Sequence, residues 1–138
     1  MPRLKSKTII DRANQYLDTD NNREKLGIFL TKFSECEVYT RPYLLDYYED
    51  EEIEENDIKL LRSDIVNAFE IAGIKFDDPK LLTRIFGESD KVGESSYRWL
   101  RNKITHELMI RAIHEVCDRN EEIIADMDSF ITQVEEQS

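Results

Sequence analysis

The chain of 138 residues has the length of a single domain, which would bury about two-thirds of the surface that its unfolded state exposes. Its residues are 40% hydrophobic and 36% charged, and no apolar run approaches membrane-spanning length. A formal net charge of -11 disfavours tight, non-specific binding of nucleic acid. Only four glycines and three prolines leave few places for hairpins, so we expect one all-α domain over residues 1–138.

Apolar residues recur at helical spacing through most of the chain. Arg41 precedes Pro42, which disfavours the helical conformation at residue 41 and predicts that a helix ends or kinks near this point. Gly73 and Gly87 are expected to close the helices that precede them. The pattern favours an antiparallel bundle of four longer helices with one or two short ones. We expect helices over about residues 5–17, 20–36, 42–48, 58–72, 79–86, 95–117 and 121–134.

Charge is distributed unevenly along the chain. Seven of the nine residues from Glu49 to Asp57 are acidic, which predicts a solvated segment or, alternatively, a docking surface for a basic partner or a mimic of phosphate charge. From Arg98 to Arg119, five Arg and Lys residues outnumber three Asp and Glu residues. A locally basic cleft can therefore exist in this acidic protein.

The cysteines and the first residues bear on the compartment. Cys36 and Cys117 lack the spacing of metal ligands or of a redox pair, so we expect them to pack as small hydrophobic residues in a reducing environment. Residues 1–7 are not followed by the apolar core of a signal peptide. We expect a cytoplasmic protein with no cofactor and no metal site.

The segment 95–117 carries the most informative motif, Arg101-Asn102-x-x-x-His106. Ser95 or Ser96 can cap a helix here, and no Gly or Pro interrupts the segment, which predicts a continuous helix of about six turns. On such a helix Arg101 and His106 lie about 140° apart. Joint action on one ligand would then need long side chains that reach around the helix, or a second copy of it.

The neighbours of the motif predict a wet pocket. Arg98 and Thr105 share one helical face with Asn102, and the same face becomes apolar from Met109 onward. Buried polar groups cost about 1–3 kcal/mol each unless they form hydrogen bonds. A cleft or a two-fold interface that keeps water avoids this cost.

This motif in a helical chain resembles the R-x4–6-H signature of HEPN-superfamily ribonucleases. The resemblance implies metal-independent endoribonuclease activity, in which the ribose 2′-hydroxyl attacks the neighbouring phosphorus. His106 would transfer protons, Arg101 would bind the phosphate, and Asn102 would hold the ribose or orient His106. Arg98 is a candidate for a further phosphate contact, and Thr105 lies on the same substrate-facing side.

The resemblance also implies partners. HEPN ribonucleases form homodimers whose paired helices make a composite active site. They often act as toxins or in phage defence, under the control of a cognate antitoxin or another regulatory protein. The alternative function is a non-catalytic acidic helical adaptor, which would bind a partner protein and would not need the motif.

Three further side chains near the motif need an interpretation. Tyr97 and Trp99 flank it and either stack on bases or belong to the core or an interface. His114 lies one residue away from the apolar stripes, and no arginine precedes it at the R-x4–6-H spacing, so we expect it at the surface without a catalytic role.

Overall fold

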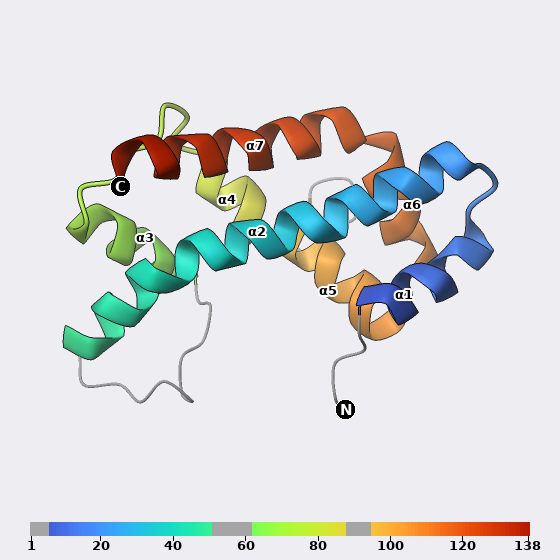
Figure 1. The fold of residues 1–138 in the computed structure, drawn as a ribbon, viewed down its shortest axis with the longest axis horizontal. Helices are drawn as coiled ribbons and strands as arrows, with labels where there is room; N and C mark the ends of the chain where they lie inside the picture. The colour runs from blue at the N-terminus through green and yellow to red at the C-terminus, as the bar shows by residue number, and fades with distance from the viewer. Residues whose placement is uncertain (1–5, 51–61, 88–94) are drawn as a thin grey trace.

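The computed structural model describes residues 6–50, 62–87 and 95–138, and structural statements refer to this part of the chain. Within these ranges the chain forms seven α-helices, one short 3-10 helix and no strand (Figure 1). The all-α prediction is confirmed. In chain order the helices are α1 (Ser6–Ala13), η1 (Asn14–Tyr16), α2 (Asp20–Asp50), α3 (Arg62–Ile71), α4 (Leu81–Phe86), α5 (Tyr97–Glu107), α6 (Ile110–Asp118) and α7 (Asn120–Gln137).

The two longest helices, α2 and α7, lie side by side and run in the same direction (Figure 1). Lys32 forms an ion pair with Asp128 at 2.7 Å, and further along both helices the Tyr39 hydroxyl donates a hydrogen bond to Glu135. Residue numbers therefore increase in the same direction along α2 and α7, so the two helices are parallel. The expected antiparallel arrangement of four longer helices is met only loosely, because this central pair is parallel.

Helix α2 passes through Pro42 without ending, so the prediction that a helix ends near this residue is wrong, while a kink there stays a prediction. Proline has no N–H to donate to the carbonyl of Val38, but both residues are exposed, so water can reach that carbonyl. Beyond the proline, Leu44 and Tyr48 are buried, and Tyr48 donates a hydrogen bond to Asp64 of α3. Packing of this second half keeps the chain helical against the local preference.

Replacing Pro42 with alanine should raise the free energy of unfolding by about 2 kcal/mol. A proline inside a helix costs about 3 kcal/mol relative to alanine, and the stiffer unfolded chain returns up to about 1 kcal/mol of this. Urea unfolding followed by circular dichroism measures the change. Pro79→Ala, at a position before α4 begins, is the matched control and should show no such gain. Equal or lower stability of Pro42→Ala would contradict the assignment of Pro42 to a helix interior.

The segment predicted as one six-turn helix is two helices. Helix α5 ends at Glu107, and Leu108 adopts a left-handed conformation with φ 49° and ψ 41°. The Leu108 N–H donates to the Ile104 carbonyl at 3.1 Å, which closes the helix in the manner of an αL cap. Helix α6 then begins at Ile110 in a new direction. The prediction of one uninterrupted helix is therefore wrong. The prediction of a single face that is polar in its first half and apolar in its second half fails with it.

Burial accounts for this break. A non-glycine residue in the left-handed region costs about 1–2 kcal/mol. After the turn, α6 buries Ala112, Ile113 and Val116 completely. Full burial of an Ile or Val side chain stabilises by about 1.5–3 kcal/mol, so docking α6 outweighs the strain at Leu108.

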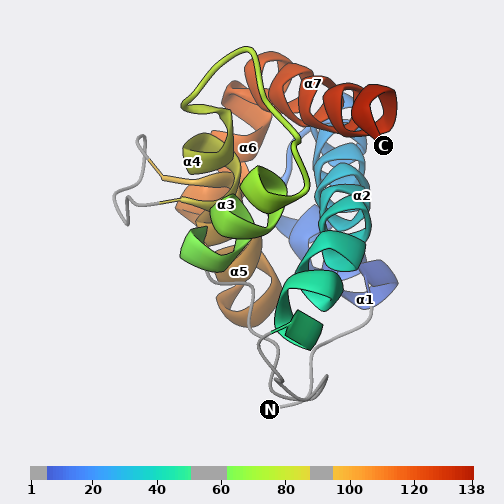
Figure 2. The same ribbon diagram turned by 90° about the vertical axis from the view of Figure 1, so that its left-hand side faces the viewer.

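Helices α3, α4 and α5 pack in succession and lie on one side of α2, as Figure 2 shows. Their inner faces meet α2 and α7 through a cluster of aromatic rings. The centre of the Phe130 ring of α7 lies 5.8 Å from the ring centres of both Phe69 and Phe86. The centre of the Phe86 ring lies 6.3 Å from that of Phe33. This core supports α5, the helix that carries the motif.

Candidate functional site

Helix α5 begins at a tight contact with the end of α4. The Ser96 Oγ accepts a hydrogen bond from the Trp99 N–H at 3.0 Å, which confirms Ser96 as the N-cap. Gly87 has φ 80°, and a Cβ at this position would lie 2.1 Å from the Ser96 Cβ. Only glycine allows this backbone geometry and this close approach, so the α4–α5 connection depends on Gly87.

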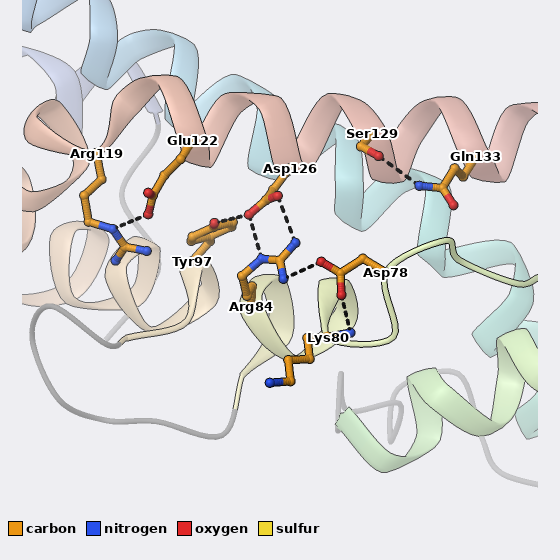
Figure 3. Close-up of polar contacts among 9 residues, drawn as sticks. All are labelled: Asp78, Lys80, Arg84, Tyr97, Arg119, Glu122, Asp126, Ser129 and Gln133. Atoms are coloured by element: carbon orange, nitrogen blue, oxygen red, sulfur yellow. Dashed lines mark hydrogen bonds and ion pairs between the residues drawn. The ribbon is translucent and has the colours of Figure 1, made fainter.

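A polar network holds the first turn of α5 against α4 and α7 (Figure 3). Arg84 makes two contacts with Asp126, at 2.8 and 3.0 Å, and an ion pair with Asp78 at 2.8 Å. The Tyr97 hydroxyl donates to the same Asp126 carboxylate. Burial, reinforced by this hydrogen bond, raises the pKa of Tyr97, so its phenol remains a donor. Tyr97 is a core residue, and base stacking at this position is excluded by its burial.

Arg101 points into the protein. Its side chain is buried, with Nη1 3.3 Å from Glu37 Oε1 and Nη2 3.3 Å from Glu37 Oε2. The guanidinium carbon lies 4.7 Å from the centre of the Phe33 ring, a cation–π distance. The fork that the motif assigns to a substrate phosphate therefore faces a carboxylate of α2.

Asn102 and His106 lie on the other side of α5. Both are exposed, and a spacing of four residues places them one turn apart on the same face. His106 belongs to the last turn, two residues before the left-handed Leu108. The structure thus brings Asn102 and His106 together and separates both from the buried side of the helix that carries Arg101.

The two predicted substrate contacts, Arg98 and Thr105, are less accessible. Arg98 is half-buried, with its guanidinium 5.9 Å from the Phe86 ring, and burial lowers its pKa while the charge of Glu37 opposes the shift. Thr105 is buried, and its hydroxyl donates weakly to the Asn102 carbonyl at 3.4 Å. Contact of either residue with a substrate stays a prediction.

Glu37 is the site residue that the sequence interpretation missed. Its side chain is 20% exposed, and its carboxylate is the counter-charge of Arg101 and also acts on Arg98. The signal was present, because Glu37 follows Phe33 by one turn and lies within the inward-facing stripe of α2. An acidic residue at a core position indicates a buried cation opposite.

Three cavities within the described residues lie away from the motif. One of about 390 Å³ and one of about 130 Å³ flank α3, and a third of about 380 Å³ lies at the α6–α7 junction. Among the residues described, no three His, Cys, Asp or Glu side chains are grouped as metal ligands would be. None of the helices in these ranges combines the length and apolar character needed to cross a membrane.

The remaining predictions concern single residues and the acidic segment. His114 is exposed, as expected. Cys36 and Cys117 are both buried, and burial raises the pKa of Cys36 to about 12, so its thiol stays protonated and unreactive at neutral pH. Glu49 and Asp50 are the last two residues of α2, while residues 51–57 of the acidic segment lie outside the described part of the chain.

No protein-family model matches this chain, and comparisons with curated proteins and with solved structures give no match either. The resemblance to HEPN ribonucleases rests on the Arg101-Asn102-x-x-x-His106 motif of α5 and on the all-α fold.

Proposed function

We propose that this protein is a metal-independent endoribonuclease of HEPN type. The observation that carries the proposal is the arrangement of the motif on α5: Asn102 and His106 share an exposed face, and Arg101, next to Asn102 in the chain, pairs with Glu37 on the buried side. Leu108, two residues after His106, is strained by its positive φ of 49° at the C-terminal cap of α5. Strain of this kind is often found at functional sites.

The chemistry assigns roles to all three motif residues. The oxygen of the ribose 2′-hydroxyl forms a bond to phosphorus, and the bond from phosphorus to the 5′-oxygen of the next nucleotide breaks. The products are a 2′,3′-cyclic phosphate and a 5′-hydroxyl. His106 suits the proton transfer, because an imidazole can accept the proton of the 2′-hydroxyl and donate a proton to the leaving 5′-oxygen. Arg101 suits the negative charge that develops on the phosphate oxygens, and Asn102 can hold the ribose or His106.

Glu37 must be displaced for Arg101 to take this role. A phosphate group is negatively charged like a carboxylate and offers two oxygens to the same guanidinium fork, so it can replace Glu37 without leaving the arginine uncompensated. The Arg101–Glu37 distances of 3.3 Å are long for a charge-assisted pair, and part of the Glu37 side chain reaches solvent. The replacement of Glu37 by a phosphate group therefore starts from a long, partly exposed ion pair.

A homodimer with a composite site is part of the proposal. Within one chain Arg101 and His106 face different surroundings, so a second copy paired along α5 is the simplest way to place both motifs on one substrate. We expect a dimer by sedimentation velocity and by light scattering at roughly tens of micromolar protein. A monomer at that concentration would contradict the composite site.

The direct test is cleavage of single-stranded RNA in the presence of a chelator. We expect cleavage to persist with EDTA, and the product to carry a 2′,3′-cyclic phosphate that mass spectrometry identifies. An otherwise identical substrate with 2′-deoxyribose at the cleaved position should remain intact, because the nucleophile is missing. Cleavage of the deoxy substrate, or dependence on a divalent metal, would contradict the mechanism.

The biological setting is proposed from the family. A ribonuclease of this type acts as a toxin or as a phage-defence effector in the cytoplasm, and a cognate antitoxin or other regulatory protein restrains it. The acidic charge of the chain suits a basic partner of this kind.

An acidic adaptor is the second candidate function. It is favoured by the burial of Arg101 between Phe33 and Glu37, because such a contact gives the arginine a structural role without any substrate. The two functions differ in what the motif must do: an adaptor tolerates substitution of His106, and a ribonuclease does not.

A further inference from the structure

The exposed side of α5 carries more than the motif. Trp99, Asn102, Lys103 and His106 follow the spacing i, i+3, i+4 and i+7, which places all four on one face of the helix. Asn102 and His106 are exposed, while Trp99 and Lys103 are half-buried. An indole, an amide, an ammonium and an imidazole therefore line one solvent-reachable strip, which we name the α5 strip.

Trp99 and Lys103 already form a cation–π contact, and a nucleobase could take the place of the ammonium on the Trp99 ring. The Lys103 ammonium lies 5.7 Å from the centre of the Trp99 ring, and the same ammonium pairs with Glu107 at 2.9 Å. Both contacts of Lys103 are near the surface, where cation–π contacts and ion pairs contribute little. A nucleobase stacked on an aromatic ring contributes more than either, so exchange of the ammonium for a base is favourable.

We propose that the α5 strip binds an unpaired RNA nucleotide next to the scissile phosphate, with its base on the Trp99 indole and its phosphate on the Lys103 ammonium. This inference rests on the proposed ribonuclease function and names its substrate class, since a base can reach Trp99 only when it is not paired in a duplex. Trp99 selects single-stranded RNA, and His106 lies two turns further along the same face to act on the adjoining phosphate.

The experiment uses the intrinsic fluorescence of the full chain, in which Trp99 is the only tryptophan. The variant His106→Ala, which we expect to cleave RNA at least about 100-fold more slowly than the wild type, is titrated with a mixed-sequence single-stranded RNA of about ten nucleotides, within the usual site size for single strands. We expect saturable quenching of the emission, and none with the same sequence as a duplex. Anisotropy of a labelled copy of the RNA measures binding independently of Trp99.

Variants in the same background separate stacking from packing. Trp99→Leu keeps an apolar side chain but removes the stack, and should weaken binding about 5- to 150-fold, whereas Trp99→Phe should lose less. If Trp99→Leu does not fold, Lys103→Gln keeps the fluorophore and should both weaken binding and lower the salt slope by about one. Tyr39→Leu, a half-buried aromatic on the α2–α7 side, is the matched control and should bind RNA as well as its parent.

The outcomes distinguish this inference from the proposed function. If RNA binds by anisotropy but neither quenches Trp99 nor responds to the variants, the α5 strip is not the base-binding site, whatever the cleavage activity. If RNA quenches Trp99 and the wild-type chain does not cleave it, base binding by the α5 strip is upheld, while the ribonuclease proposal and the place of the strip next to a scissile phosphate are wrong. If no single-stranded RNA binds, both are overturned.

Discussion

His106→Ala is expected to lower the rate of RNA cleavage by about 10²–10⁴, the usual contribution of a positioned acid–base group. His106 is exposed in the last turn of α5, and its imidazole makes no hydrogen bond or ion pair within the described residues. Its removal should therefore leave the free energy of unfolding nearly unchanged. Single-turnover cleavage of a labelled RNA measures the loss, and a thermal unfolding curve checks that the fold is retained.

His114→Ala is the matched control for this prediction, because His114 is also an exposed histidine, on the neighbouring helix α6. It should cleave RNA at the wild-type rate. Arg101→Ala should impair cleavage about as much as His106→Ala, and the double variant should be little worse if both residues act in one step. Full activity of His106→Ala would reject the HEPN mechanism and favour the acidic adaptor.

Glu37→Ala is expected to lower the free energy of unfolding by about 3 kcal/mol. The substitution leaves the buried Arg101 guanidinium without the Glu37 carboxylate, and removal of one partner of a buried pair costs about 3–5 kcal/mol. The partial exposure of Glu37 places the expected loss at the lower end of this range. Urea unfolding measures it. The control is Glu35→Ala on the same helix, whose surface contact with Lys32 at 3.8 Å should matter little.

A paired substitution separates the structural from the catalytic role of Arg101. Replacing both Arg101 and Glu37 with leucine removes the two charges together and should restore most of the stability that Glu37→Ala loses, because apolar residues of similar volume can replace a buried ion pair. A ribonuclease that uses Arg101 must be inactive in this stable double variant. If the double variant is folded and cleaves RNA at the wild-type rate, Arg101 is structural only.

Residues next to one another in the chain carried enough information to predict the all-α class, several of the helices and some of their ends. The apolar period revealed α7 almost in full, and Ser96 was recognisable as an N-cap because a hydroxyl can accept from an N–H three residues ahead. Gly87 was recognisable as a helix end because glycine alone adopts positive φ at no steric cost. The motif could also be recognised from local sequence, because its three residues lie in one helix.

Tertiary packing decided the features that local preference predicted wrongly. Pro42 and Leu108 show this in opposite directions: α2 continues through a proline because Leu44 and Tyr48 beyond it are buried, and α5 stops at a leucine because α6 must fold back to bury its own apolar face. In both cases the free energy of burial exceeds the local conformational cost. The parallel pairing of α2 with α7 likewise depends on contacts between distant segments.

The candidate site was likewise predictable from the sequence only in part. The sequence alone determined which residues are candidates, because Arg101, Asn102 and His106 lie within two turns of one another. Only the tertiary structure decided that Arg101 meets Glu37, a residue 64 positions away, while Asn102 and His106 remain exposed. Helical spacing sets the angle between side chains, but the side of the helix that is buried depends on which other helices pack against it.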